Sequence, residues 1–123
     1  MKRDLDLIRK ILQQCEDCES GSAPRAITAD GYTEEQIRFH VYLAGNSGLM
    51  ETVDVTQLGS TLPAAIPICL TWAGYEFLEN SRDDRVWSTA KKAAHASGGV
   101  AFDVVKSVLT GLAIAAASKA VGL

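Results

Sequence analysis

The chain has 123 residues, of which 47% are apolar and 22% charged, and this balance is that of a globular protein, not a disordered one. Twelve Lys and Arg residues oppose fifteen Asp and Glu residues, so the formal charge of −3 excludes a strongly basic nucleic-acid-binding protein and a long acidic tail. No apolar signal segment follows Lys2 and Arg3, and three cysteines do not suggest a disulfide framework. We therefore expect a cytoplasmic protein.

The first predicted element is an amphipathic helix over residues 4–18, because apolar side chains recur there at spacings of three and four. This apolar stripe consists of Leu5, Ile8, Leu12 and Cys15. Residues 19–24 are typical of a loop, and Ala26-Ile27-Thr28 fits a short strand.

A second helix is predicted to begin at Thr33. Thr33 and Gln36 have the spacing of a capping box, in which each side chain bonds to the backbone of the other residue. Gly48 is suited to end this helix in the left-handed conformation. Its expected apolar row is Ile37, Val41 and Ala44, with Phe39 and Leu43 beside it.

Residues 51–57 and 65–70 predict two strands that form a hairpin with a long tip. Pro67 restricts the second strand to an edge position or a bulge, since proline has no N–H to donate. Regular alternation would place Ile66, Ile68 and Leu70 on one face of that strand.

Three more helices are predicted in the second half of the chain, over residues 72–80, 83–96 and 100–123, with a break at Gly98-Gly99. Thr71 is the expected N-cap of the first, and we expect Trp72, Tyr75 and Leu78 on one side of it. The aromatic residues close together in this part of the sequence are interpreted as core, with a binding platform as the alternative. They are Trp72, Tyr75, Phe77 and Trp87.

The order helix, capped helix, Gly-Leu, hairpin, helix is that of a winged-helix domain. The chain also resembles a family of small bacteriophage and prophage proteins that is known only as a domain of unknown function. The resemblance rests first on the opening phrase Met-Lys-Arg-Asp-x-Asp-Leu-x-Arg-Lys-Ile-Leu, here residues 1–12. Later similar phrases are Ile37-Arg38-Phe39-His40, Leu70-Thr71-Trp72-x-Gly74 and Arg82-Asp83-Asp84-x-x-Trp87. The resemblance implies a phage or mobile-element origin and a winged-helix-like core, and it supplies no catalytic or binding residues.

We accordingly predict an α+β, mainly α fold. Residues 1–81 would form the winged-helix-like domain with its β-hairpin wing, and residues 82–123 a C-terminal helical hairpin used for oligomerisation or partner binding. One departure from the winged-helix pattern is that residues 19–32 are too loop-like to supply the helix that precedes the recognition helix of a helix-turn-helix motif.

Charge distribution separates two functions that this fold could serve. Between Arg38 and Arg82 there is no Lys or Arg, although this interval contains the whole predicted wing. DNA binding depends on cationic contacts to phosphate. Only Arg38, Tyr42 and Asn46 on the second helix are placed to reach a base edge. We therefore favour a protein partner, with a DNA-binding transcriptional regulator of a phage or mobile element as the alternative.

The predicted contact surface is an acidic face on the second helix and the wing, suited to a basic partner such as a nucleic-acid-binding host protein. Its residues are Glu34, Glu35, Arg38, Tyr42, Glu51 and Asp54.

Candidate chemistry in the sequence is sparse. Cys15 and Cys18 form a C-x-x-C pair, and a zinc site would need two further ligands, for which Cys69 and His40 are the candidates. A redox role needs a lowered thiol pKa, whereas this pair ends a helix and brackets two acidic residues. We interpret Cys15 as a core residue and His40 as structural, and expect no enzyme activity, no metal and no cofactor.

The last helix has no charged residue from Ser107 to Ser118, which is too short a segment to span a bilayer. Such a helix either folds back on its own domain or pairs with another copy of the chain, and we favour self-association. The predicted oligomerisation residues are Val105, Val108, Gly111, Leu112 and Ala115. The leading hypothesis is thus a non-enzymatic protein of the bacterial host cytoplasm that binds a protein partner, possesses no membrane segment and forms a homo-oligomer.

Overall fold

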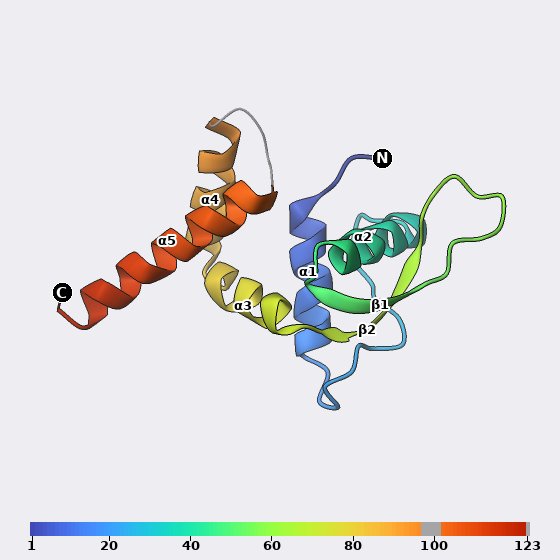
Figure 1. Ribbon diagram of the computed structural model, residues 1–123, viewed down its shortest axis with the longest axis horizontal. Coiled ribbons are helices and arrows are strands. Elements are labelled where there is room, and N and C mark those ends of the chain that lie inside the picture. The colour runs from blue at the N-terminus through green and yellow to red at the C-terminus, as the bar shows by residue number, and fades with distance from the viewer. Residues whose placement is uncertain (97–101, 123) are drawn as a thin grey trace. The chain divides into compact units, whose positions relative to one another are not determined.

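The computed structural model describes residues 1–96 and 102–122, and the chain divides into two compact units, Met1–Leu78 and Glu79–Leu123 (Figure 1). The division falls inside a helix, three residues before the boundary expected from the sequence. The predicted break at Gly98-Gly99 lies outside the described residues.

The described elements form an α+β, mainly helical protein, as predicted, with one two-stranded antiparallel sheet. In chain order they are α1 (Leu5–Glu16), α2 (Glu34–Asn46), β1 (Met50–Asp54), β2 (Ala65–Leu70), α3 (Trp72–Ser81), α4 (Asp84–Ala96) and α5 (Phe102–Ala120). In the part of the chain that the structure describes, no helix is both long and apolar enough to cross a membrane.

Helix α1 buries the predicted stripe, and Leu7 and Ile11 widen it. Asp4 is its N-cap, because its carboxylate accepts a hydrogen bond from the backbone N–H of Leu7 at 3.2 Å. This wide buried face packs against α2 and β2.

Helix α2 begins with the predicted capping box. The Thr33 hydroxyl accepts the N–H of Gln36 at 3.1 Å, and the Gln36 side chain accepts the N–H of Thr33 at 2.8 Å. The helix is followed by Gly48 with a φ of +80°, a conformation that glycine adopts without strain. Ile37, Val41 and Ala44 are buried as predicted.

The hairpin that follows contains an irregularity at Pro67. Val53 pairs with Ile66 and Thr52 with Pro67, but Glu51 pairs with Cys69, so Ile68 is the extra residue. Because this shift interrupts the alternation of side chains, Leu70 is buried whereas Ile66 and Ile68 are exposed. The expectation that these three residues share a face is therefore wrong.

Thr71 is placed to cap α3, since its hydroxyl accepts the N–H of Gly74 at 3.1 Å. A Cβ atom at Gly74 would lie 2.1 Å from the carbonyl oxygen of Leu49, so only glycine allows α3 to approach the chain this closely. The predicted common side of α3 is wrong, because Leu78 is buried whereas Trp72 and Tyr75 are exposed. The interpretation of Trp72 and Tyr75 as core residues is wrong for the same reason. The buried positions of the helix include Phe77, as expected for a core residue.

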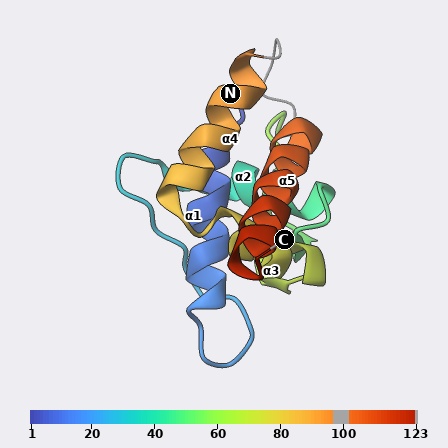
Figure 2. The same ribbon diagram turned by 90° about the vertical axis from the view of Figure 1, so that its left-hand side faces the viewer.

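In the second unit, Asp83 accepts the backbone N–H groups of Arg85 and Val86 at 2.8 and 3.2 Å and so begins α4. Helices α4 and α5 pack against each other (Figure 2), and Trp87 is buried as predicted. The side chains buried along α5 are Val105 and Leu109.

No strand forms at residues 26–28, in contrast to the sequence prediction. Among the described residues, no strand pairs with residues 26–28. Instead, the side chain of Gln14 bonds to the backbone of Thr28 as donor to its carbonyl and acceptor of its N–H.

Candidate functional site

The predicted contact surface begins on α2. Glu34 and Arg38 form an ion pair of 2.8 Å one helical turn apart, and both side chains remain largely exposed. Glu35 is exposed and Tyr42 is half-buried. An exposed pair of this kind contributes little to stability, so both charged groups remain available to a partner.

The hairpin supplies the remaining predicted residues. Glu51 is exposed on β1, and its carboxylate lies 3.9 Å from the sulfur of Cys69. Asp54 accepts the backbone N–H of Thr56 at 2.8 Å, and hydrogen bonds from Thr56 hold the pKa of that carboxyl below its usual value. Asp54 therefore stays ionised where β1 ends.

The structure brings part of this set together. Glu34, Glu35 and Arg38 line a hollow of about 480 Å³ opposite residues of the hairpin, from Val55 to Ala64. Tyr42, Glu51 and Asp54 do not line that hollow. The acidic face is thus two neighbouring features, one on α2 and one along β1.

The sequence favours core positions for Trp72 and Tyr75, with a binding platform only as the alternative, and it does not predict the exposed apolar residues of the hairpin. Trp72 is 81% exposed, and Ile66 and Ile68 are 42% and 44% exposed. Trp72 is held along α3 because its indole N–H donates to Glu76 at 3.0 Å. We use the name apolar hairpin surface for the exposed apolar residues of the two strands and of the adjoining α3: Val53, Ile66, Ile68, Trp72 and Tyr75. Pro67 could have indicated the exposure of Ile66 and Ile68, because a bulge beside it changes which side chains of the strand point outward.

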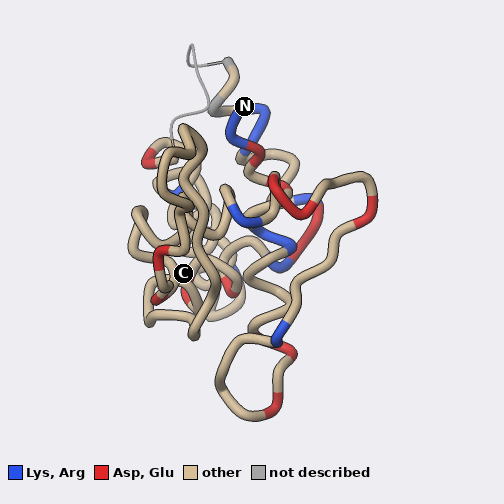
Figure 3. The backbone as a smooth tube through the Cα atoms, turned by 90° about the vertical axis from the view of Figure 1, so that its right-hand side faces the viewer, with Lys and Arg blue, Asp and Glu red and all other residues tan. Residues whose placement is uncertain are grey.

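The stretch of sequence that supplies this surface has no basic residue, although Arg25 and Arg38 line a groove beside Ile66. Basic residues colour other parts of the tube in Figure 3, and none occurs from Phe39 to Ser81. The same interval carries Glu51, Asp54, Glu76 and Glu79. This stretch therefore offers no cationic side chain for a contact with phosphate.

His40 takes part in a structural hydrogen-bond network. Its imidazole is 2% exposed, with Nε2 accepting the N–H of Asp4 at 2.8 Å and Nδ1 donating to the carbonyl of Gln36 at 2.7 Å. The second oxygen of Asp4 accepts the hydroxyl of Tyr32 at 2.6 Å, which raises the pKa of Tyr32 to about 12. Because both imidazole nitrogens are engaged, His40 is not presented to a ligand.

The cysteines do not form a metal centre in the described residues. Cys15 is buried, Cys18 and Cys69 are partly exposed, and all three are free thiols. Burial is the main cause that raises the pKa of Cys15 to about 11, with the neighbouring Cys18 and Cys69 adding to it. Over residues 1–96 and 102–122, no cluster of three or more His, Cys, Asp or Glu side chains could hold a metal ion.

The predicted oligomerisation residues on α5 differ in how far they are exposed to solvent. Val105 is buried and therefore cannot face a second copy, whereas Val108 and Leu112 are partly exposed. Gly111 and Ala115 are exposed. Ile114, which the prediction omitted, is 62% exposed.

Comparison with known proteins places the chain in a family. A protein of Haemophilus influenzae, described as an uncharacterized protein, is 33% identical over 112 residues, which span 88% of this chain and 92% of that protein. No solved structure matches the chain. Residues 2–101 match the family described as Hypothetical protein (DUF2513). This match covers most of the sequence, and the chain belongs to the DUF2513 family.

Proposed function

We propose that this protein is a non-enzymatic binding protein that engages a protein partner through the apolar hairpin surface and its acidic surroundings. The observation that carries the proposal is the exposure of Trp72, Ile66 and Ile68 within an interval that has no Lys or Arg. Exposed tryptophan is the side chain most often found at the energetic centre of a protein interface. A solvated apolar surface of this kind is covered when a partner binds.

The expected partner carries a basic face. Glu51 and Asp54 lie on the same strand as Val53, and Glu76 accepts the indole N–H of Trp72 on α3. Their negative charge favours association with Lys and Arg. Host proteins that bind nucleic acid have such faces. A host-directed role in the cytoplasm of a bacterium fits this chemistry.

The proposal also includes a winged-helix-like core and a phage or prophage origin. The succession of α2, Gly48, the hairpin and α3 supports a winged-helix-like core for the first unit. The opening phrase of residues 1–12 supports a phage or prophage origin. In this proposal the wing serves a protein partner instead of DNA.

A pull-down from bacterial lysate with the tagged full chain, run with and without nuclease, tests the proposal. We expect a captured protein that survives nuclease and is lost with Trp72→Ala and with Ile68→Ser. Leu58→Ser, which alters another exposed apolar side chain on the hairpin, is the matched control and should leave capture unchanged. Recovery of nucleic acid alone, together with tight and salt-sensitive retardation of random duplex DNA, would instead support the DNA-binding alternative.

We also propose that α5 mediates self-association. This rests on the exposure of Ile114, Gly111 and Ala115, which leaves an apolar helix side uncovered in the single chain. Light scattering should give about twice the monomer mass at high concentration, since cyclic dimers are the commonest oligomers. Ala115→Glu should yield monomers, whereas Ala116→Glu, the same substitution at an exposed position about 100° or more around α5 from Gly111, Ile114 and Ala115, should not. A monomeric mass for the unmodified chain at every concentration would contradict the proposal.

A further inference from the structure

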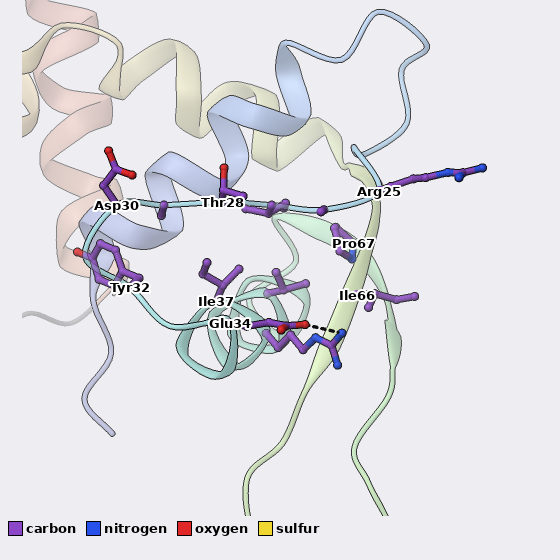
Figure 4. Close-up of a pocket in the computed structure, with 13 residues that line it drawn as sticks. Arg25, Thr28, Asp30, Tyr32, Glu34, Ile37, Ile66 and Pro67 are labelled. Atoms are coloured by element: carbon purple, nitrogen blue, oxygen red, sulfur yellow. Dashed lines mark ion pairs between the residues drawn. The ribbon is translucent and has the colours of Figure 1, made fainter.

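A groove of about 470 Å³ lies within the first unit, between the segment of residues 25–30, helix α2 and strand β2 (Figure 4). Ile37 and Val41 of α2, which are 7% and 1% exposed, lie at its base, and Ile66 and Pro67 close the groove at β2. The lining also includes the charged residues Arg25, Asp30, Glu34 and Arg38. Figure 4 shows Ile37 directed from the helix toward the segment. The volume is that of a typical binding site for a small ligand or a few side chains.

One wall of the groove is a piece of chain with the character of a strand. Residues 27–29 contain neither turn nor bend and run straight past α2 in Figure 4. On the side of α1, the Gln14 carboxamide bonds to both the N–H and the carbonyl of Thr28. A carboxamide that takes both backbone groups of one residue occupies the place of a neighbouring strand on that edge.

The other edge of this segment is open. In an extended chain the backbone groups of successive residues point to opposite edges, so Ile27 and Ala29 direct theirs away from Gln14. Both residues line the groove. Among the described residues the N–H groups of Ile27 and Ala29 have no hydrogen-bond partner, and the carbonyl of Ala29 accepts the N–H of Tyr32 at 3.2 Å.

We propose that this groove binds an extended peptide segment of a partner protein, which pairs with the backbone of Ile27 and Ala29 and places an aliphatic side chain against Ile37. Unpaired backbone groups beside apolar side chains are recognised by a strand, because a strand supplies hydrogen bonds at its edge and side chains at every second residue. A helix is a poor occupant, since its backbone groups are already paired and it is about 10 to 12 Å wide.

The groove and the apolar hairpin surface are distinct sites. Ile66 borders both, but Trp72 and Ile68 do not line the groove, and Ala29 belongs to the groove alone. The peptide proposal therefore does not depend on the function proposed for the hairpin, and variants can separate the two.

The test uses random 12-residue peptides displayed on yeast and selected against the intact full chain. Enriched peptides are synthesised, and their affinities are measured by fluorescence anisotropy. We expect Ala29→Pro to weaken binding about 3- to 10-fold, because it removes one N–H on the open edge while Ile37 and Ile66 stay unchanged. Thr61→Pro, which places proline in an exposed loop of the hairpin outside the groove, is the control and should change the affinity less than twofold.

A second measurement guards against a variant that fails to fold. In the unmodified protein, saturation with peptide should slow hydrogen exchange of the Ile27 and Ala29 amides at least about tenfold. Failure to enrich any peptide, equal affinity for Ala29→Pro and Thr61→Pro, or unchanged exchange at these two amides would overturn the proposal. Loss of peptide binding with Trp72→Ala but not with Ala29→Pro would also overturn it and would assign the peptide to the hairpin surface.

Discussion

Helices α1 and α5 are both rich in apolar residues, yet they bury very different shares of them. The 12 residues of α1 include six that are buried, whereas the 19 residues of α5 include two, Val105 and Leu109. In α1 the apolar residues form one broad stripe with charged residues opposite. In α5 they are spread around the helix, and many are alanines.

The difference shows that the placement of apolar groups determines burial more than their number. A helix can present one side to its own unit, so residues spread over all sides leave some in solvent. The exposed side of α1 is polar and needs no cover. The exposed side of α5 is apolar, and self-association is therefore proposed for α5 and not for α1.

The largest expected effect tests this contrast directly. Leu12→Ala in α1 should lower the free energy of unfolding by about 2 to 5 kcal/mol, because Leu12 is fully buried and its removal leaves a cavity. Ile114→Ala in α5 should change it by less than about 0.5 kcal/mol, because Ile114 is exposed. Urea denaturation followed by circular dichroism, at a concentration where the chain is monomeric, measures both. Equal losses of unfolding free energy in the two variants would contradict the contrast drawn between α1 and α5.

A close backbone contact provides the next test. Gly74→Ala should destabilise the first unit by about 1 to 3 kcal/mol or more, since the new Cβ would meet the Leu49 carbonyl at 2.1 Å. Gly45→Ala is the matched control, because its Cβ would meet the Thr52 side chain, which can rotate away, so a smaller loss is expected. Thermal unfolding of the two variants distinguishes these outcomes. A Gly74→Ala protein as stable as the unmodified chain would show that α3 does not approach this closely.

Much of the fold was predictable, because its signals are local. The stripe of α1, the Thr33–Gln36 capping box and Gly48 each depend on residues close in sequence. The faces of β2 and α3 were not predictable, because they depend on contacts with distant residues. A shift at Pro67 moves Leu70 to the buried side, and Leu49 determines where Gly74 lies.

The candidate site divides in the same way. Charge is visible in the sequence, so the acidic residues and the absence of Lys and Arg around the hairpin were predictable. The exposure of Trp72 was not, because an aromatic residue near other aromatic residues is usually buried. The groove was not either, because the side chain of Gln14 takes the place of a strand that the sequence pattern could not supply.

Asp4, at the start of α1, accepts a hydrogen bond from the hydroxyl of Tyr32, and titration of Tyr32 tests this contact. The hydrogen bond from Tyr32 to the Asp4 carboxylate raises the pKa of the phenol from 10.0 to about 12. The folded protein thus holds this proton more tightly than the unfolded chain, so the bond stabilises the fold below pH 10 and its contribution is lost as the pH rises from 10 to 12.

Asp4→Asn should move the pKa of Tyr32 back toward 10.0, because the amide carries no charge. The helix should persist, since asparagine is also a good N-cap. The ultraviolet absorbance of the phenolate follows the titration, and Tyr32→Phe identifies the signal. An unchanged late titration in Asp4→Asn would assign the raised pKa to another group.

The smallest expected effect concerns the exposed side of α5. Gly111→Ala should raise the free energy of unfolding by about 0.5 to 1 kcal/mol, because alanine favours the helix interior and its Cβ would meet nothing within 4 Å. This gain belongs to the single chain and should appear at low protein concentration. If α5 pairs with a second copy through Gly111, the added methyl group would separate the two helices, and the same variant should associate more weakly at high concentration. Stability that rises while association weakens would place Gly111 in the contact between copies. A gain in stability with unchanged association would place that contact on another side of α5.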